Sequence, residues 1–168
     1  DIIEQEKFWL KPLKEIADNI IDTTKLNLPN LRRILETNYS TSQHLKLNLR
    51  ILSFGYKYGI PREADIVVDM RFVKNPFYMK ELKKLTGKDL KVINYISGQI
   101  NFKNFYKLFL EIHKIIIPAF LTEGKKFLTI AFGCTGGIHR SVMMAEKFSK
   151  DIFSKKIEIS LEHRDLKK

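Results

Sequence analysis

Residues 133–141 combine glycines with polar and cationic side chains, as an anion-binding loop does. They read Gly-Cys-Thr-Gly-Gly-Ile-His-Arg-Ser and follow an apolar run over 127–132. The next segment, 138–154, has apolar residues at helical spacing. Glycines let an anion approach main-chain N–H groups closely, and the first turn of a helix adds unpaired N–H groups and the positive end of its dipole. The sequence therefore predicts a site for a phosphate-bearing ligand where a strand meets a helix.

Polar side chains of this loop supply further hydrogen-bond donors. Thr135 and Ser141 carry hydroxyl groups, His139 carries a ring N–H, and Arg140 can hold two phosphate oxygens at once. The alternative interpretation is that the glycines only make a tight strand-to-helix turn. The candidate ligand-binding residues of the loop are Cys134, Thr135, Gly136, Gly137, His139, Arg140 and Ser141.

Cys134 and Arg140 also have the spacing of the Cys-x5-Arg-Ser/Thr signature of cysteine-dependent phosphatases. In that chemistry a thiolate attacks phosphorus, and a helix N-terminus with nearby cations lowers the thiol pKa. A general acid would have to be Asp69 or Asp89, and neither lies in a recognisable acid loop. The sequence thus leaves open an enzyme that uses Cys134, Arg140 and Asp69, and also a merely structural buried cysteine.

A second group of polar residues can complete the site from the opposite side. Asp69 and Arg71 are two residues apart in a predicted strand over 66–72, so both are expected on one face of the sheet. Asp69 can accept a hydrogen bond from a sugar hydroxyl or amine. Alternatively, Asp69 and Arg71 form only a structural ion pair. The candidates in this group are Lys57, Asp69, Arg71 and Asn75.

Composition limits the classes of protein that fit. Thirty Lys and Arg residues against nineteen Asp and Glu give a net charge of +11, which attracts RNA, DNA and anionic metabolites. Cys134 is the single cysteine, so no internal disulfide can form. No apolar run is long enough to cross a membrane, and no signal peptide is visible. Four scattered histidines and one cysteine give no metal-site spacing. We expect a cytoplasmic protein without a bound metal.

The spacing of apolar residues predicts the secondary structure. In the long helix the predicted buried stripe is Phe102, Phe105, Phe109, Ile112, Ile116 and Ala119. The predicted helices are 2–16, 28–35, 102–121 and 138–154, and the predicted strands are 19–22, 45–51, 66–72, 127–132 and 157–161. A polar stretch over 37–44 indicates a linker. Strands that alternate with helices favour a three-layer α/β/α sandwich with a mixed or mostly parallel sheet.

Several motifs in order resemble the RapZ/YvcJ family of bacterial nucleotide-binding proteins and RNase adapters. They are Ser53-Phe-Gly-Tyr-Lys-Tyr-Gly-Ile-Pro61, Ala64-Asp-Ile-Val-Val-Asp-Met-Arg-Phe72, Asn75-Pro76, Leu85-Thr-Gly-Lys-Asp89, the 133–141 loop and His163-Arg164. The resemblance covers residues 45–168 as the carboxy-terminal domain. Residues 1–44 are similar to the end of the amino-terminal P-loop kinase-like domain and its linker.

The resemblance implies a phosphofructokinase-like fold and a regulatory function. Relatives sense a sugar phosphate, glucosamine-6-phosphate, and present a small regulatory RNA to an endoribonuclease, and their carboxy-terminal domains form homo-oligomers. The family's basic tail is represented only by Lys167 and Lys168, and the RNA-binding candidates are these two lysines and Arg164. This chain has no Gly-x4-Gly-Lys-Ser/Thr motif. ATP or GTP binding is therefore expected only in the amino-terminal domain, and this chain is not expected to be an enzyme.

Two positions depart from the family pattern. Phe77 stands where many relatives have His after the Asn-Pro pair, and Ile138 replaces a usually polar residue in the loop. We expect a phosphometabolite-sensing, RNA-binding regulatory domain. The alternatives are the cysteine-dependent phosphatase and a structural oligomerisation domain of a nucleotide-binding ATPase or GTPase.

Overall fold

The computed structural model describes residues 2–24, 26–28, 30–31, 34–35, 46–152 and 157–167. The chain divides into two compact units, Asp1–Gln43 and His44–Lys168. The predicted linker over 37–44 lies outside the described residues. In the predicted helix 28–35 the described residues, Leu28, Asn30, Leu31, Ile34 and Leu35, are helical. No helix in the described part of the chain is both long and apolar enough to cross a membrane.

The first unit contains the predicted amino-terminal helix, α1 (Ile2–Ile16). The predicted strand over 19–22 is wrong, since these residues have no regular secondary structure. Instead the Asp22 carboxylate accepts hydrogen bonds from the N–H of Thr24 at 2.9 Å and from its hydroxyl at 2.6 Å. An Asp side chain that bonds two residues ahead favours a turn over an extended strand.

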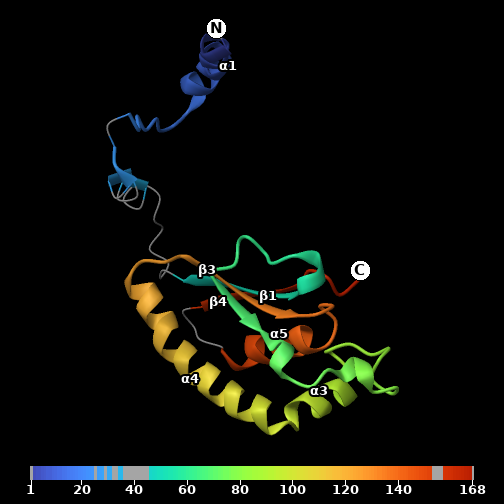
Figure 1. The fold of residues 1–168 in the computed structure, drawn as a ribbon. Coiled ribbons are helices and arrows are strands. Elements are labelled where there is room, and N and C mark those ends of the chain that lie inside the picture. The colour runs from blue at the N-terminus through green and yellow to red at the C-terminus, as the bar shows by residue number, and fades with distance from the viewer. Residues whose placement is uncertain are drawn as a thin grey trace. The chain divides into compact units, whose positions relative to one another are not determined.

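The second unit is built on a four-stranded sheet in which every neighbouring pair is parallel (Figure 1). Its strands are β1 (Leu47–Gly55), β2 (Ile66–Asp69), β3 (Phe127–Cys134) and β4 (Ile157–His163), in the order β2-β3-β1-β4. The two central strands, β1 and β3, have near-continuous apolar runs because both of their faces are covered. The predicted α/β class is confirmed.

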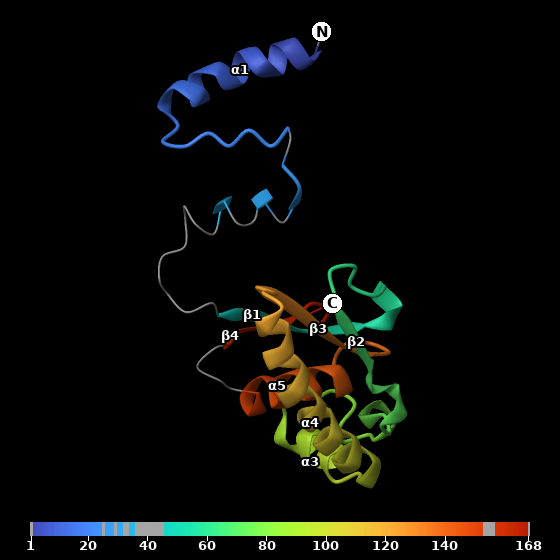
Figure 2. The same ribbon diagram turned by 90° about the vertical axis from the view of Figure 1, so that its left-hand side faces the viewer.

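Helices α3 (Leu90–Ser97), α4 (Ile100–Thr122) and α5 (Arg140–Asp151) lie on one side of the sheet (Figures 1 and 2). The main core forms between them and that face. On the opposite face Leu52, Phe54 and Ala131 are covered by Tyr56 and Ala64, from the segment that begins with the one-turn helix η1 (Tyr56–Tyr58). A parallel sheet flanked in this way is consistent with the predicted three-layer α/β/α sandwich.

Two predicted elements need correction. The predicted strand 66–72 ends at Asp69, and Met70–Phe72 forms a 3-10 turn, η2. The cause is local, because the Asp69 carboxylate accepts a hydrogen bond from the N–H of Arg71 at 2.9 Å and caps the turn. Asp69 and Arg71 therefore do not lie on one strand face as predicted.

The buried stripe of α4 also differs from the prediction after Phe109. Ile112 is 53% exposed and Ala119 is exposed, while His113 and Ile117 are buried. His113 Nδ1 lies 2.7 Å from the carbonyl oxygen of Phe109, and this contact satisfies one ring nitrogen inside the core. A search for apolar residues alone misses a stripe that passes through a histidine.

Candidate functional site

The carboxyl ends of three strands meet where the glycine-containing loop begins. Gly55 of β1 is paired with Cys134 of β3, and Asp69 of β2 is paired with Gly133. Ligands of parallel α/β sheets bind outside the carboxyl ends of the strands. The loop and the second predicted group of polar residues thus lie at the same edge of the sheet.

Two glycines at this edge are required by close main-chain approach. A Cβ atom on Gly55 would lie 2.7 Å from the carbonyl carbon of Gly136. Gly137 has a φ of +76°, and its Cβ would lie 2.8 Å from the nitrogen of Gly55. Gly136 is different, since a Cβ there would meet open space. Its N–H has no hydrogen-bond partner among the residues that the structure describes, so this part of the main chain is open to a ligand.

The thiol of Cys134, which is 3% exposed, is contacted by Gly137 and Ser141. The N–H of Gly137 donates to Sγ at 3.3 Å, and the Ser141 hydroxyl lies 3.2 Å from it. Burial by itself would raise the pKa of the thiol, but the contacts with Ser141 and Gly137 and the charge of Arg140 hold that pKa below its usual value. The surroundings of Cys134 at the start of α5 therefore favour the thiolate form, in which the sulfur accepts hydrogen bonds.

Ser141 and His139 are predicted ligand residues that the structure places inside the protein. Ser141 is fully buried against Cys134. His139 is buried too, and its Nε2 lies 3.2 Å from the carbonyl oxygen of Leu82. Burial lowers the pKa of His139 below its usual value. In this structure both side chains hold the loop in place.

Arg140 is 5% exposed and connects the two halves of the site. Its Nη1 donates to the carbonyl oxygens of Val73 at 2.9 Å and Arg71 at 3.2 Å. Its Nη2 donates to the hydroxyl oxygen of Thr135 at 3.2 Å. Nε is buried with no partner in the described part of the chain. The guanidinium thus positions segment 71–73 and keeps unused donor capacity.

Asp69 and Arg71 form a bidentate ion pair, with Nη2 2.6 Å from Oδ2. Hydrogen bonds from Arg71 hold the pKa of Asp69 below its usual value. The guanidinium also lies over the ring of Tyr56, 4.0 Å from its centroid. Both charged groups remain about half exposed. The pair can therefore contact a ligand as one unit that offers an acceptor and a donor.

Lys57 and Asn75 are placed by short helices on either side of this pair. The N–H of Lys57 donates to the carbonyl oxygen of Thr135 at 3.3 Å, which joins η1 to the loop. Asn75 caps η3 (Pro76–Tyr78), and its Oδ1 accepts from the N–H of Phe77 at 3.2 Å. The main chain of Lys57 thus lies next to the loop, and the side-chain oxygen of Asn75 is engaged in capping η3.

An open pocket of about 620 Å³ adjoins Asp69 on the β2 side of the sheet. It lies between β2, η2 and the first half of α4. Its lining residues are Val67, Val68, Asp69, Phe72, Asn101, Asn104, Phe105 and Phe109. Amide and aromatic side chains in one pocket suit a polyhydroxylated group, which has both polar edges and an apolar face.

The predicted RNA-binding tail is partly used for internal contacts. Arg164 Nη2 donates to the carbonyl oxygen of Gly59 at 2.7 Å and to the buried carboxylate of Asp165 at 2.8 Å. Asp165 in turn accepts from the N–H of Gly55 at 2.8 Å. Lys167 is exposed, and Lys168 lies outside the described residues. Arg164 thus supports the strand end under the site.

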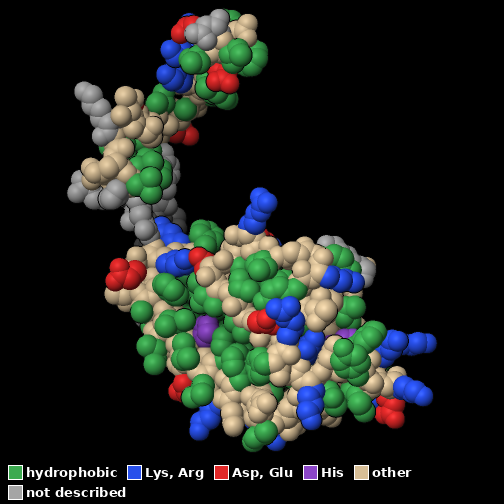
Figure 3. All heavy atoms as spheres, viewed as in Figure 1, with side chains coloured by type: hydrophobic (Ala, Val, Ile, Leu, Met, Phe, Trp, Pro, Cys, Tyr) green, Lys and Arg blue, Asp and Glu red, His purple; other side chains and the backbone are tan. Residues whose placement is uncertain are grey.

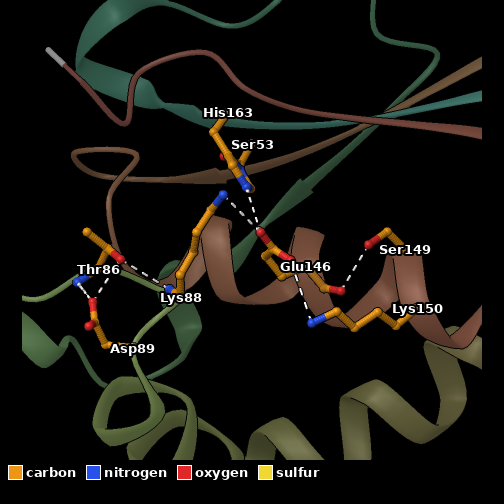
Figure 4. A network of polar contacts seen from close by, with 8 residues as sticks. All are labelled: Ser53, Thr86, Lys88, Asp89, Glu146, Ser149, Lys150 and His163. Carbon is orange, nitrogen blue, oxygen red and sulfur yellow. Dashed lines mark hydrogen bonds and ion pairs between the residues drawn. The ribbon is translucent and has the colours of Figure 1, made fainter.

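Sequence reasoning missed a polar network that supports α5 from its side (Figure 4). His163 Nδ1 lies 2.8 Å from the hydroxyl of the buried Ser53, and its Nε2 lies 3.2 Å from the carboxylate of Glu146. Lys88 Nζ lies 3.1 Å from the same carboxylate. Ser53 and His163 are 110 residues apart and belong to the first and the last of the family motifs, so no local sequence signal indicates their contact.

Neither candidate general acid is held protonated. The Asp89 carboxylate accepts hydrogen bonds from the N–H of Thr86 at 2.7 Å and from its hydroxyl at 2.9 Å, and these bonds lower the pKa of Asp89. The pKa of Asp69 is lowered by Arg71. A general acid needs a pKa near the working pH, so both carboxylates are poorly suited to protonate a leaving group.

Taken together, these features define a parallel α/β domain with a glycine-containing loop and a buried arginine at the carboxyl edge of its sheet. Residues 47–167 match the family model described as the RapZ C-terminal domain. The chain belongs to this family, which confirms the resemblance found in its motifs.

Relatives with curated descriptions are similar along nearly the whole chain. A nucleotide-binding protein of Clostridium perfringens is 44% identical over 166 residues, which are 98% of this chain and 56% of that protein. Nucleotide-binding proteins of Lactobacillus acidophilus and Lactiplantibacillus plantarum are 40% and 42% identical, over 99% and 100% of this chain and 56% and 57% of theirs. The chain therefore spans about half the length of these relatives.

Proposed function

We propose that the second unit is a regulatory domain that senses a phosphorylated metabolite and binds RNA. The observation that supports the ligand half is the open N–H of Gly136 beside Thr135. Thr135 contacts both Arg140 and the main chain of Lys57. An unpaired main-chain donor next to a hydroxyl that contacts a guanidinium is an arrangement that suits a phosphate group.

In this proposal the phosphate oxygens accept hydrogen bonds from Gly136 N–H and from the Thr135 hydroxyl. Thr135 Oγ1 accepts from Arg140, so its own proton remains available to a ligand. The buried Nε–H of Arg140 has no protein partner among the described residues. Hydrogen bonds between a guanidinium and a phosphate are about twice as strong as neutral ones.

Glucosamine-6-phosphate, the ligand that the resemblance implies, fits this arrangement. Its phosphate would lie on the loop, and its ammonium group would pair with Asp69, which keeps a lowered pKa and so stays ionised. Its ring would enter the pocket between β2 and α4. In this proposal the phosphate is the group that decides affinity, because the contacts at the loop are made by hydrogen-bond donors.

Titration calorimetry tests the ligand half. Wild type should release or absorb saturable heat with glucosamine-6-phosphate, and glucosamine without phosphate should give none. Thr135→Val removes the hydroxyl and should weaken binding about ten- to a hundredfold, since a hydrogen bond to a charged group contributes about 1.5–3 kcal/mol. Thr122→Val, at the far end of α4, is the matched control. Absence of heat with wild type at millimolar ligand would refute this half.

The RNA half is supported by the net charge of +11. Neutralising phosphates releases counterions, so affinity should fall steeply between about 50 and 200 mM salt. Flat binding over this range would refute it.

Some properties that the resemblance implies depend on the whole protein, of which this chain matches only about half. We propose that ATP or GTP is bound by the kinase-like domain of the whole protein, and that the second unit forms homo-oligomers and presents RNA to an endoribonuclease in the cytoplasm. The family membership and the relatives' description as nucleotide-binding proteins support this assignment.

A second candidate function is a cysteine-dependent phosphatase. It is favoured by the lowered pKa of Cys134 and by its two hydrogen-bond partners. The buried sulfur and the ionised state of Asp69 and Asp89 speak against it. Turnover of an aryl phosphate that disappears in Cys134→Ser would support this function, and turnover that survives the substitution would exclude it.

A further inference from the structure

Exposed aromatic and basic side chains gather in residues 74–84, which we call the lysine–aromatic segment. Phe77, Tyr78 and Met79 are consecutive and exposed, and Tyr78 is 82% exposed. Scattered apolar residues are normal on a protein surface, but three consecutive exposed ones form a patch of the kind that marks an interaction site. Figure 3 shows lysine side chains next to apolar ones on the side where Figure 1 draws this segment.

The charge of the segment is strongly positive. It carries four lysines against one acidic residue, Glu81. Within the described part of the chain, none of these four lysines forms an ion pair with a carboxylate. They are Lys74, Lys80, Lys83 and Lys84. The patch therefore attracts a polyanion and disfavours a second copy of this basic chain.

The main chain of the segment is anchored to the rest of the domain. Asn75 caps η3, and Pro76 and Leu82 of the segment are themselves buried. The carbonyl oxygens of Val73 and Leu82, at its two ends, contact Arg140 and His139 of the loop. Rigid presentation lowers the entropic cost of binding.

The geometry of the rings leaves a face of Tyr78 free. The Phe77 and Tyr78 rings meet edge-on, with centroids 6.1 Å apart and an interplanar angle of 78°. Lys83 Nζ lies over the Phe77 ring at 4.7 Å from its centroid. One ring is thus covered by a cation and the other is open. Exposed aromatic rings interleaved with lysines are typical of surfaces that bind single-stranded nucleic acid, since bases stack on the rings and the cations follow the backbone.

We propose that the lysine–aromatic segment is the contact surface for single-stranded RNA, with a base stacked on Tyr78 and phosphates held by Lys80 and Lys83. The proposal rests on the RNA half of the proposed function and gives it a location that differs from the carboxy-terminal tail. It implies a preference for unpaired RNA, because the bases of a duplex are stacked on each other and not free to stack on a ring.

Fluorescence anisotropy of the full chain with a labelled twelve-nucleotide oligouridine, and with an RNA duplex of equal length, tests the proposal. Wild type should bind the single strand more tightly. Tyr78→Ala should weaken that binding about tenfold, as removal of a stacking ring does, whereas Tyr78→Phe should retain it. Phe127→Ala is the matched control, since Phe127 is 71% exposed at the amino end of β3.

The lysines are tested in the same assay. Lys83→Ala should lower the slope of log affinity against log salt by about one, as removal of one phosphate contact does. Lys46→Ala, at an exposed position just before β1, should leave the slope unchanged.

The outcomes separate this proposal from the proposed function. If wild type binds RNA and Tyr78→Ala binds it as tightly as Phe127→Ala does, RNA binding is supported but its location at the lysine–aromatic segment is overturned. If duplex and single-stranded RNA bind equally and only the lysine variants weaken both, binding depends on charge alone and base stacking on Tyr78 is overturned. Polyglutamate that competes equally well on wild type and Tyr78→Ala would point to an acidic protein partner and overturn the proposal. No RNA binding by wild type would overturn both.

Discussion

The guanidinium of Arg140 donates a hydrogen bond to the main-chain carbonyl of Val73 at 2.9 Å. The residue predicted to hold a ligand phosphate thus also fastens the segment that leads into the lysine–aromatic segment. A second carbonyl, of Arg71, lies 3.2 Å from the same nitrogen. Any movement of Arg140 at the ligand loop would therefore also disturb its hydrogen bonds to segment 71–73.

Arg140→Lys should reduce the free energy of unfolding by about 1–3 kcal/mol. A lysine keeps the charge but lacks the planar fork that reaches two carbonyls and Thr135, and buried acceptors left without a donor carry a cost of this size. Urea unfolding measures it. Arg50→Lys is the control, because the ion pairs of Arg50 with Glu63 and Glu162 are exposed and contribute about 0–1 kcal/mol. Equal losses in the two variants would contradict the role given to Arg140.

Gly137→Ala and Gly136→Ala should separate packing from ligand binding. Alanine at position 137 must adopt a φ of +76° and place its Cβ 2.8 Å from the Gly55 nitrogen, so we expect a loss of about 1–3 kcal/mol in the free energy of unfolding. Alanine at position 136 meets open space and should change it by less than about 1 kcal/mol.

Gly136→Ala should weaken phosphate binding although it leaves the free energy of unfolding nearly unchanged. A methyl group there lies on the open side of the main chain, so Gly136→Ala should bind glucosamine-6-phosphate more weakly in calorimetry while unfolding like wild type. A Gly136→Ala protein with unchanged affinity would mean that the ligand does not approach this part of the loop.

Stability should decline as the pH falls below about 6.5. Burial lowers the pKa of His113, His139 and His163 below the value of 6.5 that applies to an unfolded chain. Below that pH the unfolded state binds more protons than the folded state, so the histidine contribution is complete above pH 6.5 and is lost as the pH falls through the lowered pKa values. The loss begins at about pH 6.5, which is above the usual carboxyl pKa values of 3.8 and 4.5.

His113→Phe should reduce this loss. The ring lies between Phe109 and Phe148, at centroid distances of 4.0 and 5.1 Å, and its Nε2 has no partner in the described part of the chain. Urea unfolding at about pH 7.5 and pH 5.5, on either side of the usual histidine pKa, should show a smaller difference in the variant than in wild type. An unchanged difference would show that His113 does not titrate on unfolding.

The elements that were predicted correctly are those with local signals. The apolar run before Cys134 and the glycines after it are enough to predict β3 and the loop at its end. The end of β2 was missed because a side chain, Asp69, caps a turn in an otherwise strand-like sequence. The course of α4 was missed because the polar His113 occupies a core position.

Whether a side chain of the site is free for a ligand depends on contacts with residues that are distant in the sequence. Arg140 contacts carbonyls 67 and 69 residues away, and His139 contacts a carbonyl 57 residues away. Spacing within the loop indicates which side chains can bind an anion. It does not reveal which of them the rest of the fold has already engaged, and for Ser141 and His139 the fold has done so.

Phosphate binding by the main chain at Gly136 can be followed through the amide resonance of Gly136 in a proton–nitrogen correlation spectrum. Titration with glucosamine-6-phosphate should move this resonance downfield and saturably, and inorganic phosphate should move it the same way with lower affinity. Glucosamine should leave it in place. A Gly136 resonance that stays unmoved while resonances elsewhere in the chain respond to the ligand would show that the phosphate binds at another place.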